Sequence, residues 1–157
     1  MTNNDVFRRL KYAFNYNPEK IILLFAQVGV KVDRVDISKY LEKDTDEKEN
    51  TSLTDFQFAS FLNGMIVENR GKKDGKIPVA EKELDNNIIF RKLRIALNLK
   101  DTDILELLKL AGFNFGKSEL SAFFRKPTHQ HYKKCQDQVL RNFLNALFLK
   151  HQENKGK

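Results

Sequence analysis

The feature that most constrains this chain is an internal repeat. Residues 4–42 align with residues 87–125 without a gap at a constant offset of 83, and after a deletion of one residue the offset becomes 82. Because the identities extend beyond the hydrophobic pattern, we interpret the chain as two copies of one module. The identical pairs are Asn4 and Asn87, Phe7 and Phe90, Arg8 and Arg91, Leu10 and Leu93, Ala13 and Ala96, Asn15 and Asn98, Ile21 and Ile104, Leu24 and Leu107, Gly29 and Gly112, Ser38 and Ser121, Asp55 and Asp137, Phe61 and Phe143, Leu62 and Leu144, and Asn63 and Asn145.

Each copy is predicted to form four helices. Apolar residues recur at helical spacing, as in Phe7, Leu10 and Phe14, and the 7 Gly and 3 Pro are too few for the turns of an all-β chain. The fold class is therefore all-α, with two tandem four-helix repeats. Candidate helix boundaries are an N-cap at Asn4 or Asn87, a start near Pro18 or Asp101, an end at Gly29 or Gly112, a third helix from Asp33 or Gly116, and a fourth over residues 53–69 or 135–151.

The repeat also sets the domain boundaries. Residues 1–70 form the first helical repeat, the Gly- and Lys-rich residues 71–85 form a linker, and residues 86–157 form the second repeat. Gly64 lies within a predicted helix opposite Ala146, where small side chains allow a close helix crossing. Either the two fourth helices pack together across a pseudo-twofold axis, or Gly64 makes room for a bulky side chain of its own repeat.

The net charge of +7 is unevenly distributed between the copies. Residues 1–80 hold 13 Lys and Arg against 12 Asp and Glu, a net charge of +1, whereas residues 81–157 hold 15 against 9, a net charge of +6. An excess of this kind favours an anionic partner.

Two groups of basic residues are candidates for contact with nucleic-acid phosphates. One group recurs on the first helix of each copy, and the other lies in the third helix of the second copy and the loop after it. The candidates are Arg8, Arg9, Lys11, Arg91, Lys92, Arg94, Lys117, Arg125, Lys126, Lys133 and Lys134. An ordinary solvated helix face is the alternative interpretation of the first-helix cations.

The loop before the fourth helix has opposite charge in the two copies. The first copy carries Asp44, Asp46, Glu47 and Glu49, and the second carries Arg125, Lys126, His129, His131, Lys133 and Lys134. Either these loops attract each other, within one chain or between chains, or the basic loop engages an anionic partner.

Other motifs are too weak to predict chemistry. The sequence GKKDGK at residues 71–76 lacks the glycine spacing and the hydroxyl residue of a phosphate-binding loop. The second and third helices resemble a helix-turn-helix, but their connection is too long and the exposed charges are mixed. The group His129, His131, Cys135 and Asp137 matches no standard zinc module, so we predict no metal, cofactor or catalytic residue.

The chain resembles the bacterial YehS-type family, a family of unknown function whose members carry this repeat twice. The resemblance covers nearly the whole chain and rests on NDVFRRLKYAF, FLNGMIVENRGK and NNIIFRKLRIALNLK. It also includes a block of residues before and within the last helix, namely Arg125, Pro127, His129, Tyr132, Cys135, Asp137, Gln138, Leu140 and Arg141. The resemblance implies a small cytoplasmic protein and brings no activity, substrate or cofactor.

Together these observations favour a non-enzymatic helical binding module. Its expected partner is nucleic acid, or a nucleic-acid-associated protein, bound through the basic second repeat. The alternative is a protein-interaction or self-assembling scaffold. Both hypotheses allow a homo-oligomer. No apolar stretch is long enough to span a membrane, and one cysteine forms no internal disulfide, so we expect a cytoplasmic location without membrane contact.

Overall fold

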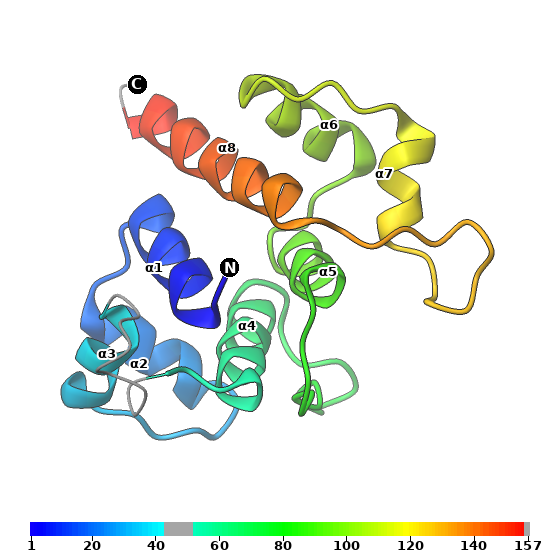
Figure 1. Cartoon of the computed structure of the whole chain (residues 1–157). Helices are drawn as coiled ribbons and strands as arrows, with labels where there is room; N and C mark the ends of the chain where they lie inside the picture. The colour runs from blue at the N-terminus through cyan, green and yellow to red at the C-terminus, as the bar shows by residue number, and fades with distance from the viewer. Residues whose placement is uncertain (43–51, 156–157) are drawn as a thin grey trace.

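The computed structural model describes residues 1–42 and 52–155, and this part of the chain forms eight helices and no strand. The all-α prediction and the two tandem repeats are confirmed (Figure 1). None of the helices described is both long and apolar enough to cross a membrane. The helices are α1 (Asn3–Phe14), α2 (Pro18–Ala26), α3 (Arg34–Leu41), α4 (Asp55–Arg70), α5 (Asn86–Ala96), α6 (Asp101–Leu110), α7 (Lys117–Phe123) and α8 (Asp137–Lys155).

The first helix of each repeat begins before the asparagine that was predicted to cap it. The N-cap of α1 is Thr2, whose hydroxyl accepts a hydrogen bond from Asp5 N at 3.1 Å. The N-cap of α5 is Asp85, whose carboxylate accepts from Ile88 N at 2.8 Å. The prediction of Asn4 and Asn87 as N-caps is therefore wrong, because both are buried in the first turn and bind more distant backbone.

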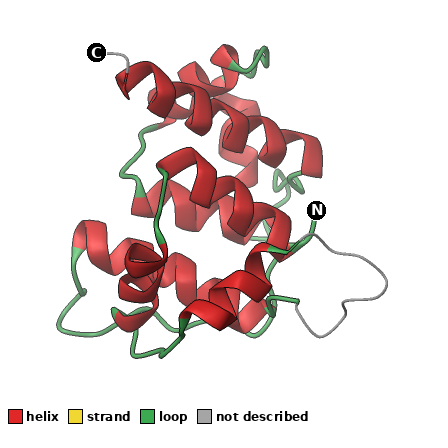
Figure 2. Cartoon of the chain, turned by 90° about the vertical axis from the view of Figure 1, so that its left-hand side faces the viewer, coloured by secondary structure: helices red, strands yellow, loops and turns green. Residues whose placement is uncertain are grey.

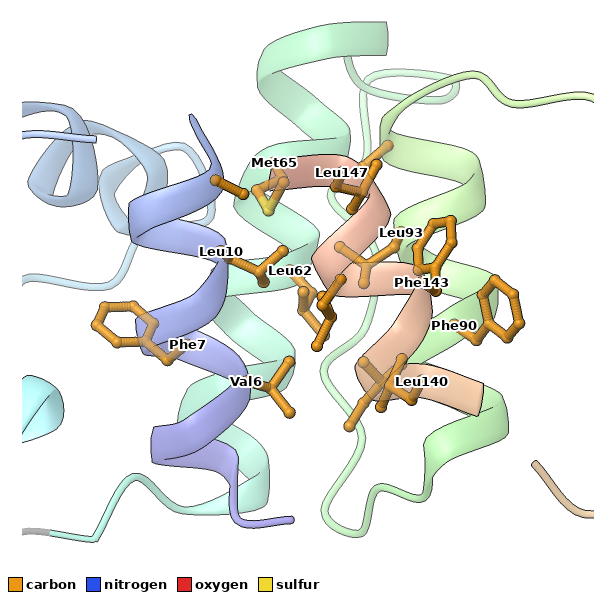
Figure 3. Close-up of a cluster of buried hydrophobic side chains, with 14 of the residues drawn as sticks. Val6, Phe7, Leu10, Leu62, Met65, Phe90, Leu93, Leu140, Phe143 and Leu147 are labelled. Carbon is orange, nitrogen blue, oxygen red and sulfur yellow. The ribbon is translucent and has the colours of Figure 1, made fainter. Parts of the chain in front are cut away.

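In each repeat, the first helix packs against the fourth helix of the other repeat. The most extensive helix interfaces join α1 to α8 and α4 to α5, whereas α1 barely contacts α4 and α5 barely contacts α8. Because α5 is the repeat of α1 and α8 is the repeat of α4, these are two copies of one interface. A pseudo-twofold axis therefore relates the repeats, and the side chains of both interfaces share one core (Figure 3).

The ends of these helices repeat the same exchange. Leu84 N donates a hydrogen bond to Asp55 Oδ2 at 2.9 Å, and the Met1 amine donates to Asp137 Oδ2 at 2.6 Å. In each pair, a group just before the first helix of one repeat contacts the first residue of the fourth helix of the other. These bonds and the α1–α8 and α4–α5 interfaces hold the two repeats together in the assembly of helices that Figure 2 shows from the side.

Gly64 makes room within its own repeat, as the second interpretation held, but for backbone and not for a bulky side chain. A Cβ atom at Gly64 would lie 1.9 Å from Leu24 O, so the glycine allows α4 to approach the backbone of α2 in its own repeat. The hypothesis that the fourth helices pack on each other is wrong, since the axis is built from α1 with α8 and α4 with α5. Ala146 holds the equivalent place in α8 and is buried.

Residues 71–85 join α4 to α5, and their second half is bound to these two helices. A turn at Asp74 and Gly75, both with positive φ, brings Lys73 opposite Lys76. Beyond the turn, Pro78 O accepts a hydrogen bond from Asn63 Nδ2 at 3.3 Å. The chain then returns to the start of α5 (Figure 1).

Candidate functional site

The cations predicted on the first helices do not form two equivalent surfaces. Arg8 donates to Glu42 O at 2.8 Å and also pairs with Asp5, so its guanidinium is bound within its own repeat. Arg94 Nη1 lies 2.9 Å from Asp101 Oδ1, and its guanidinium carbon lies 4.7 Å from the centre of the Phe124 ring. Both arginines are held within the fold.

Lys92 is withdrawn from the surface altogether. Its side chain is 8% exposed, and its Nζ lies 2.7 Å from Asn63 Oδ1 and 2.9 Å from Glu81 Oε1. An ammonium that is buried and already bound to two acceptors offers no surface cation for a phosphate to contact. Among the first-helix cations, Arg9 and Arg91 are exposed, while Lys11 is half-buried with its Nζ 5.0 Å from the centre of the Tyr12 ring.

The remaining candidates centre on the segment between α7 and α8, residues 124–136, which we call the basic loop. Asn87 Nδ2 donates to Phe123 O at 3.0 Å and to Lys133 O at 2.9 Å, and Asn87 Oδ1 accepts from Cys135 N at 2.9 Å. Lys133 N also donates to Ala122 O at 3.1 Å. A buried side chain of α5 therefore fixes both ends of the loop.

The basic loop carries cations without compensating acids. Lys126, Lys133 and Lys134 are exposed, and Arg125 Nη1 lies 3.4 Å from His129 Nε2. Residues 120–136 contain no Asp or Glu. Within the part of the chain that the structure describes, no carboxylate lies within ion-pair distance of these four cations.

Arg91 belongs to the same surface, and Lys117 does not. Arg91 is exposed and lies one turn of α5 after Asn87, which binds the loop, so it lies on the same side of that helix as the loop contacts. Lys117 is the first residue of α7, at the opposite end of that helix from the basic loop. The structure thus brings together Arg91, Arg125, Lys126, Lys133 and Lys134.

Planar side chains accompany these cations, and sequence reasoning overlooked their role. The rings of His129 and His131 lie 5.6 Å apart between centroids, and Tyr132 N donates to His129 O at 3.0 Å. Nucleic-acid bases stack on planar rings that lie beside cations. The signal was present in the sequence, since all three residues lie between Lys126 and Lys133.

The structure separates the four residues that were considered as a metal or nucleophile group, namely His129, His131, Cys135 and Asp137. Cys135 is buried, and burial, followed by the charge of Asp137, raises the pKa of its thiol to about 12. The Asp137 carboxylate accepts from Asn86 Nδ2 at 2.7 Å and from the Met1 amine at 2.6 Å, and these contacts lower its pKa. Among the residues described, no three His, Cys, Asp or Glu side chains gather at metal-binding distances.

A groove of about 520 Å³ lies beside the C-terminal half of α8, between α6 and the end of α1. Its lining includes Phe14, Leu99, Leu110, Leu147, Asp103 and Lys150. In the first repeat the equivalent positions are bridged, because Lys20 Nζ lies 3.7 Å from Glu68 Oε1 and Gln27 Nε2 donates to Glu68 Oε2 at 2.7 Å. The two copies thus differ here too, since polar contacts join these positions in the first repeat and a groove lies between them in the second.

Comparison with known proteins identifies a family without assigning an activity. Residues 3–71 and 86–152 each match the model of the family described as "Protein of unknown function (DUF1456)". The chain is 37% identical over 158 residues to the "Uncharacterized protein YehS" of Escherichia coli (strain K12), covering 99% of this chain and 100% of that protein. No solved structure matches the chain significantly.

Proposed function

We propose that this chain, which belongs to the family of proteins of unknown function DUF1456, is a non-enzymatic binding module that contacts nucleic acid through its basic loop. The observation that carries the proposal is that Lys126, Lys133 and Lys134 are exposed and that they and the half-buried Arg125 have no paired carboxylate among the residues described. Asn87 fixes both ends of this loop, so little conformational freedom is lost when the cations meet a ligand.

Nucleic acid suits this surface better than a compact anion does. Cations stand near both ends of the loop, at Arg125 and Lys126 and again at Lys133 and Lys134, so successive phosphates of one strand can contact them in turn. Arg91 extends the row onto α5, and Tyr132, His129 and His131 supply rings for stacking. The first copy has acidic residues at the corresponding loop positions 44, 46, 47 and 49, which lie outside the described residues.

The test is a titration of labelled mixed-sequence single-stranded DNA and RNA, followed by fluorescence anisotropy. Replacement of Lys126, Lys133 and Lys134 by Glu should weaken binding by about tenfold or more, since three phosphate contacts are lost. The matched control replaces Lys72, Lys73 and Lys76, which are exposed beside the 73–76 turn, by Glu. This control changes the net charge by the same amount and should weaken binding much less. Equal losses in both variants, or no binding by the native protein, would contradict the proposal.

The second candidate function, a protein-interaction or self-assembling scaffold, is favoured by exposed apolar side chains on α6 and α8. Leu110 and Leu149 are 47% and 40% exposed, and Phe148 is 38% exposed. Light scattering at increasing protein concentration and raised salt distinguishes the two functions. A mass that increases with concentration supports assembly, and a constant mass together with oligonucleotide binding supports the first function.

A further inference from the structure

The pseudo-twofold axis relates two faces of the molecule, and the linker covers only one of them. The operation that carries α5 onto α1 and α4 onto α8 carries Lys92 onto Arg9 and Asn63 onto Asn145. The face between α4 and α5 is in contact with residues 78–81, whereas no segment of the described chain crosses the face between α1 and α8 in the same way. The repeat therefore provides both a covered and an uncovered version of one surface.

The covered face shows how an extended segment binds there. Residues 77–80 have no regular structure, and Pro78 O accepts from Asn63 Nδ2 at 3.3 Å. Three residues later, Glu81 Oε1 lies 2.9 Å from Lys92 Nζ, which also donates to Asn63 Oδ1 at 2.7 Å. One backbone carbonyl and one carboxylate thus satisfy the two polar side chains of this face.

The column of α4 that carries Asn63 is buried along its length. Ala59, Asn63 and Val67 are spaced four residues apart and lie on one side of the helix, and all three are buried. Their counterparts on α8 are Arg141, Asn145 and Leu149, and all three are exposed. The two equivalent columns therefore differ, one being buried and the other exposed.

The uncovered face keeps the chemistry of the covered one and strengthens its charge. Arg9 replaces Lys92 and is exposed, and Asn145 keeps the amide of Asn63. Arg141 adds a second cation, and Leu149 and Tyr12, which are 40% and 63% exposed, add apolar surface. The side chains offered are therefore two cations, one amide and two apolar groups.

We propose that the face between α1 and α8 binds an extended, acidic segment of a partner protein in the way that the linker occupies the face between α4 and α5. A carboxylate of the partner pairs with Arg9, a backbone carbonyl of the partner accepts from the Asn145 amide, and an apolar side chain packs on Leu149. Charge complementarity selects this occupant, because the two exposed arginines replace one buried lysine and one alanine of the covered face.

The linker of the same chain does not occupy this second face. Its Pro78 carbonyl and Glu81 carboxylate already contact Asn63 and Lys92. A tethered segment also binds its own site at a high effective concentration, so a free peptide of the same sequence does not displace it easily. A free copy of the linker sequence is therefore a probe for the uncovered face.

The experiment adds a fluorescent peptide with the sequence of residues 77–84 to the full-length protein and follows its anisotropy. We expect saturable binding that Arg9→Glu weakens by about tenfold, as does a peptide in which the residue corresponding to Glu81 is Gln. Lys39→Glu, which reverses an exposed cation on α3, is the matched control and should leave the affinity unchanged. In ¹H–¹⁵N spectra, the Asn145 side-chain amide signal should shift on titration.

Three results would overturn the proposal. The first is absence of saturable binding, and the second is binding that Arg9→Glu and Lys39→Glu affect equally. The third is loss of oligonucleotide affinity in Arg9→Glu with unchanged peptide affinity, which would assign this face to nucleic acid. Because Arg9 and Lys39 are both exposed, the variants should fold, and circular dichroism verifies this.

Discussion

In each repeat, one buried asparagine binds the backbone just before the fourth helix. Asn4 Oδ1 accepts from Leu53 N at 2.8 Å, and its Nδ2 donates to Tyr40 O at 3.0 Å. Asn87 makes the corresponding contacts in the second repeat, to Cys135 N and Phe123 O. An asparagine near a helix start has the sequence signature of a cap, and only its distant partners reveal that it joins two segments.

Replacement of Asn87 by Ala should destabilise the protein markedly. The change leaves Cys135 N, Phe123 O and Lys133 O without their partner, and it should lower the free energy of unfolding by about 2 kcal/mol or more. Urea unfolding followed by circular dichroism measures the loss. Asn114→Ala, at an exposed position, is the control and should change the free energy of unfolding by less than about 0.5 kcal/mol. Similar midpoints for the two variants would show that the Asn87 contacts contribute little.

The buried thiol of Cys135 and the partly buried phenol of Tyr16 should make the protein less stable at alkaline pH. Burial raises the pKa of both Cys135 and Tyr16 to about 12, with Asp137 and Glu68 as the secondary causes. Between the unfolded pKa of each group and pH 12, the unfolded chain binds fewer protons than the native one, so the stability falls as the pH rises. From Cys135 alone the loss is about 1 kcal/mol per pH unit above about pH 9.

Urea midpoints measured from pH 7 to pH 10.5 test this expectation. Cys135→Ala should flatten the decline above pH 9, and Tyr16→Phe should flatten it above pH 10, since each removes one titrating group. A decline with the same slope in both variants and in the native protein would assign it to other groups.

At the scale of elements, Gly64 and Ala146 occupy equivalent places with different consequences. Gly64→Ala should lower the free energy of unfolding by about 3 kcal/mol or more, because the added Cβ would lie 1.9 Å from Leu24 O and backbone yields little. Ala146→Gly is the matched control and should cost only about 1 kcal/mol of helix propensity. Thermal unfolding of both variants provides the measurement. An equal loss of unfolding free energy in the two variants would mean that α2 can shift away from α4 to make room for the added methyl group.

Helix positions were predictable from the sequence, but helix pairing was not. Pro18 and Asp101 begin α2 and α6 as predicted, because their start signals are local. The sequence does not show that α1 packs on α8 and not on α4, because these two helices have nearly the same apolar pattern. Lys92 and Arg9 likewise look equivalent in sequence, and only the path of the linker buries one of them.

The basic loop shows the same division between local and distant information. Its excess of cations was visible in the sequence, and the opposite charge of the first-copy loop marked it as a difference between the copies. Its anchorage by Asn87, which lies 46 to 48 residues away along the chain at the contacted positions, was not visible. Only the fold places Arg91 on the same surface as the loop.

At the scale of the whole molecule, the exchange of helices makes each repeat depend on the other. Fragments 1–74 and 75–157, divided at the 73–76 turn, each expose an apolar face that the missing half should cover. Each fragment alone should therefore show reduced helicity and a broad thermal transition, and an equimolar mixture should recover the cooperative transition of the intact chain. Two fragments that fold separately as monomers would contradict the exchanged packing.

Duplication has thus preserved the core and changed the surface. The core residues of both halves join one cluster, whereas the linker covers one face only and the basic loop belongs to one repeat only. These asymmetries locate the proposed functions, with nucleic acid at the basic loop and an acidic segment between α1 and α8.

The most direct test of the central claim is the salt dependence of single-stranded DNA binding. If the four cations of the basic loop and Arg91 contact phosphates, the logarithm of the binding constant should fall with the logarithm of salt concentration with a slope of about −3.5. Replacing Lys126, Lys133 and Lys134 by Glu should reduce the magnitude of that slope by about 2, while the same change at Lys72, Lys73 and Lys76 should leave it unchanged. A slope near zero for the native protein, or the same slope in the Lys126, Lys133 and Lys134 variant, would contradict the account.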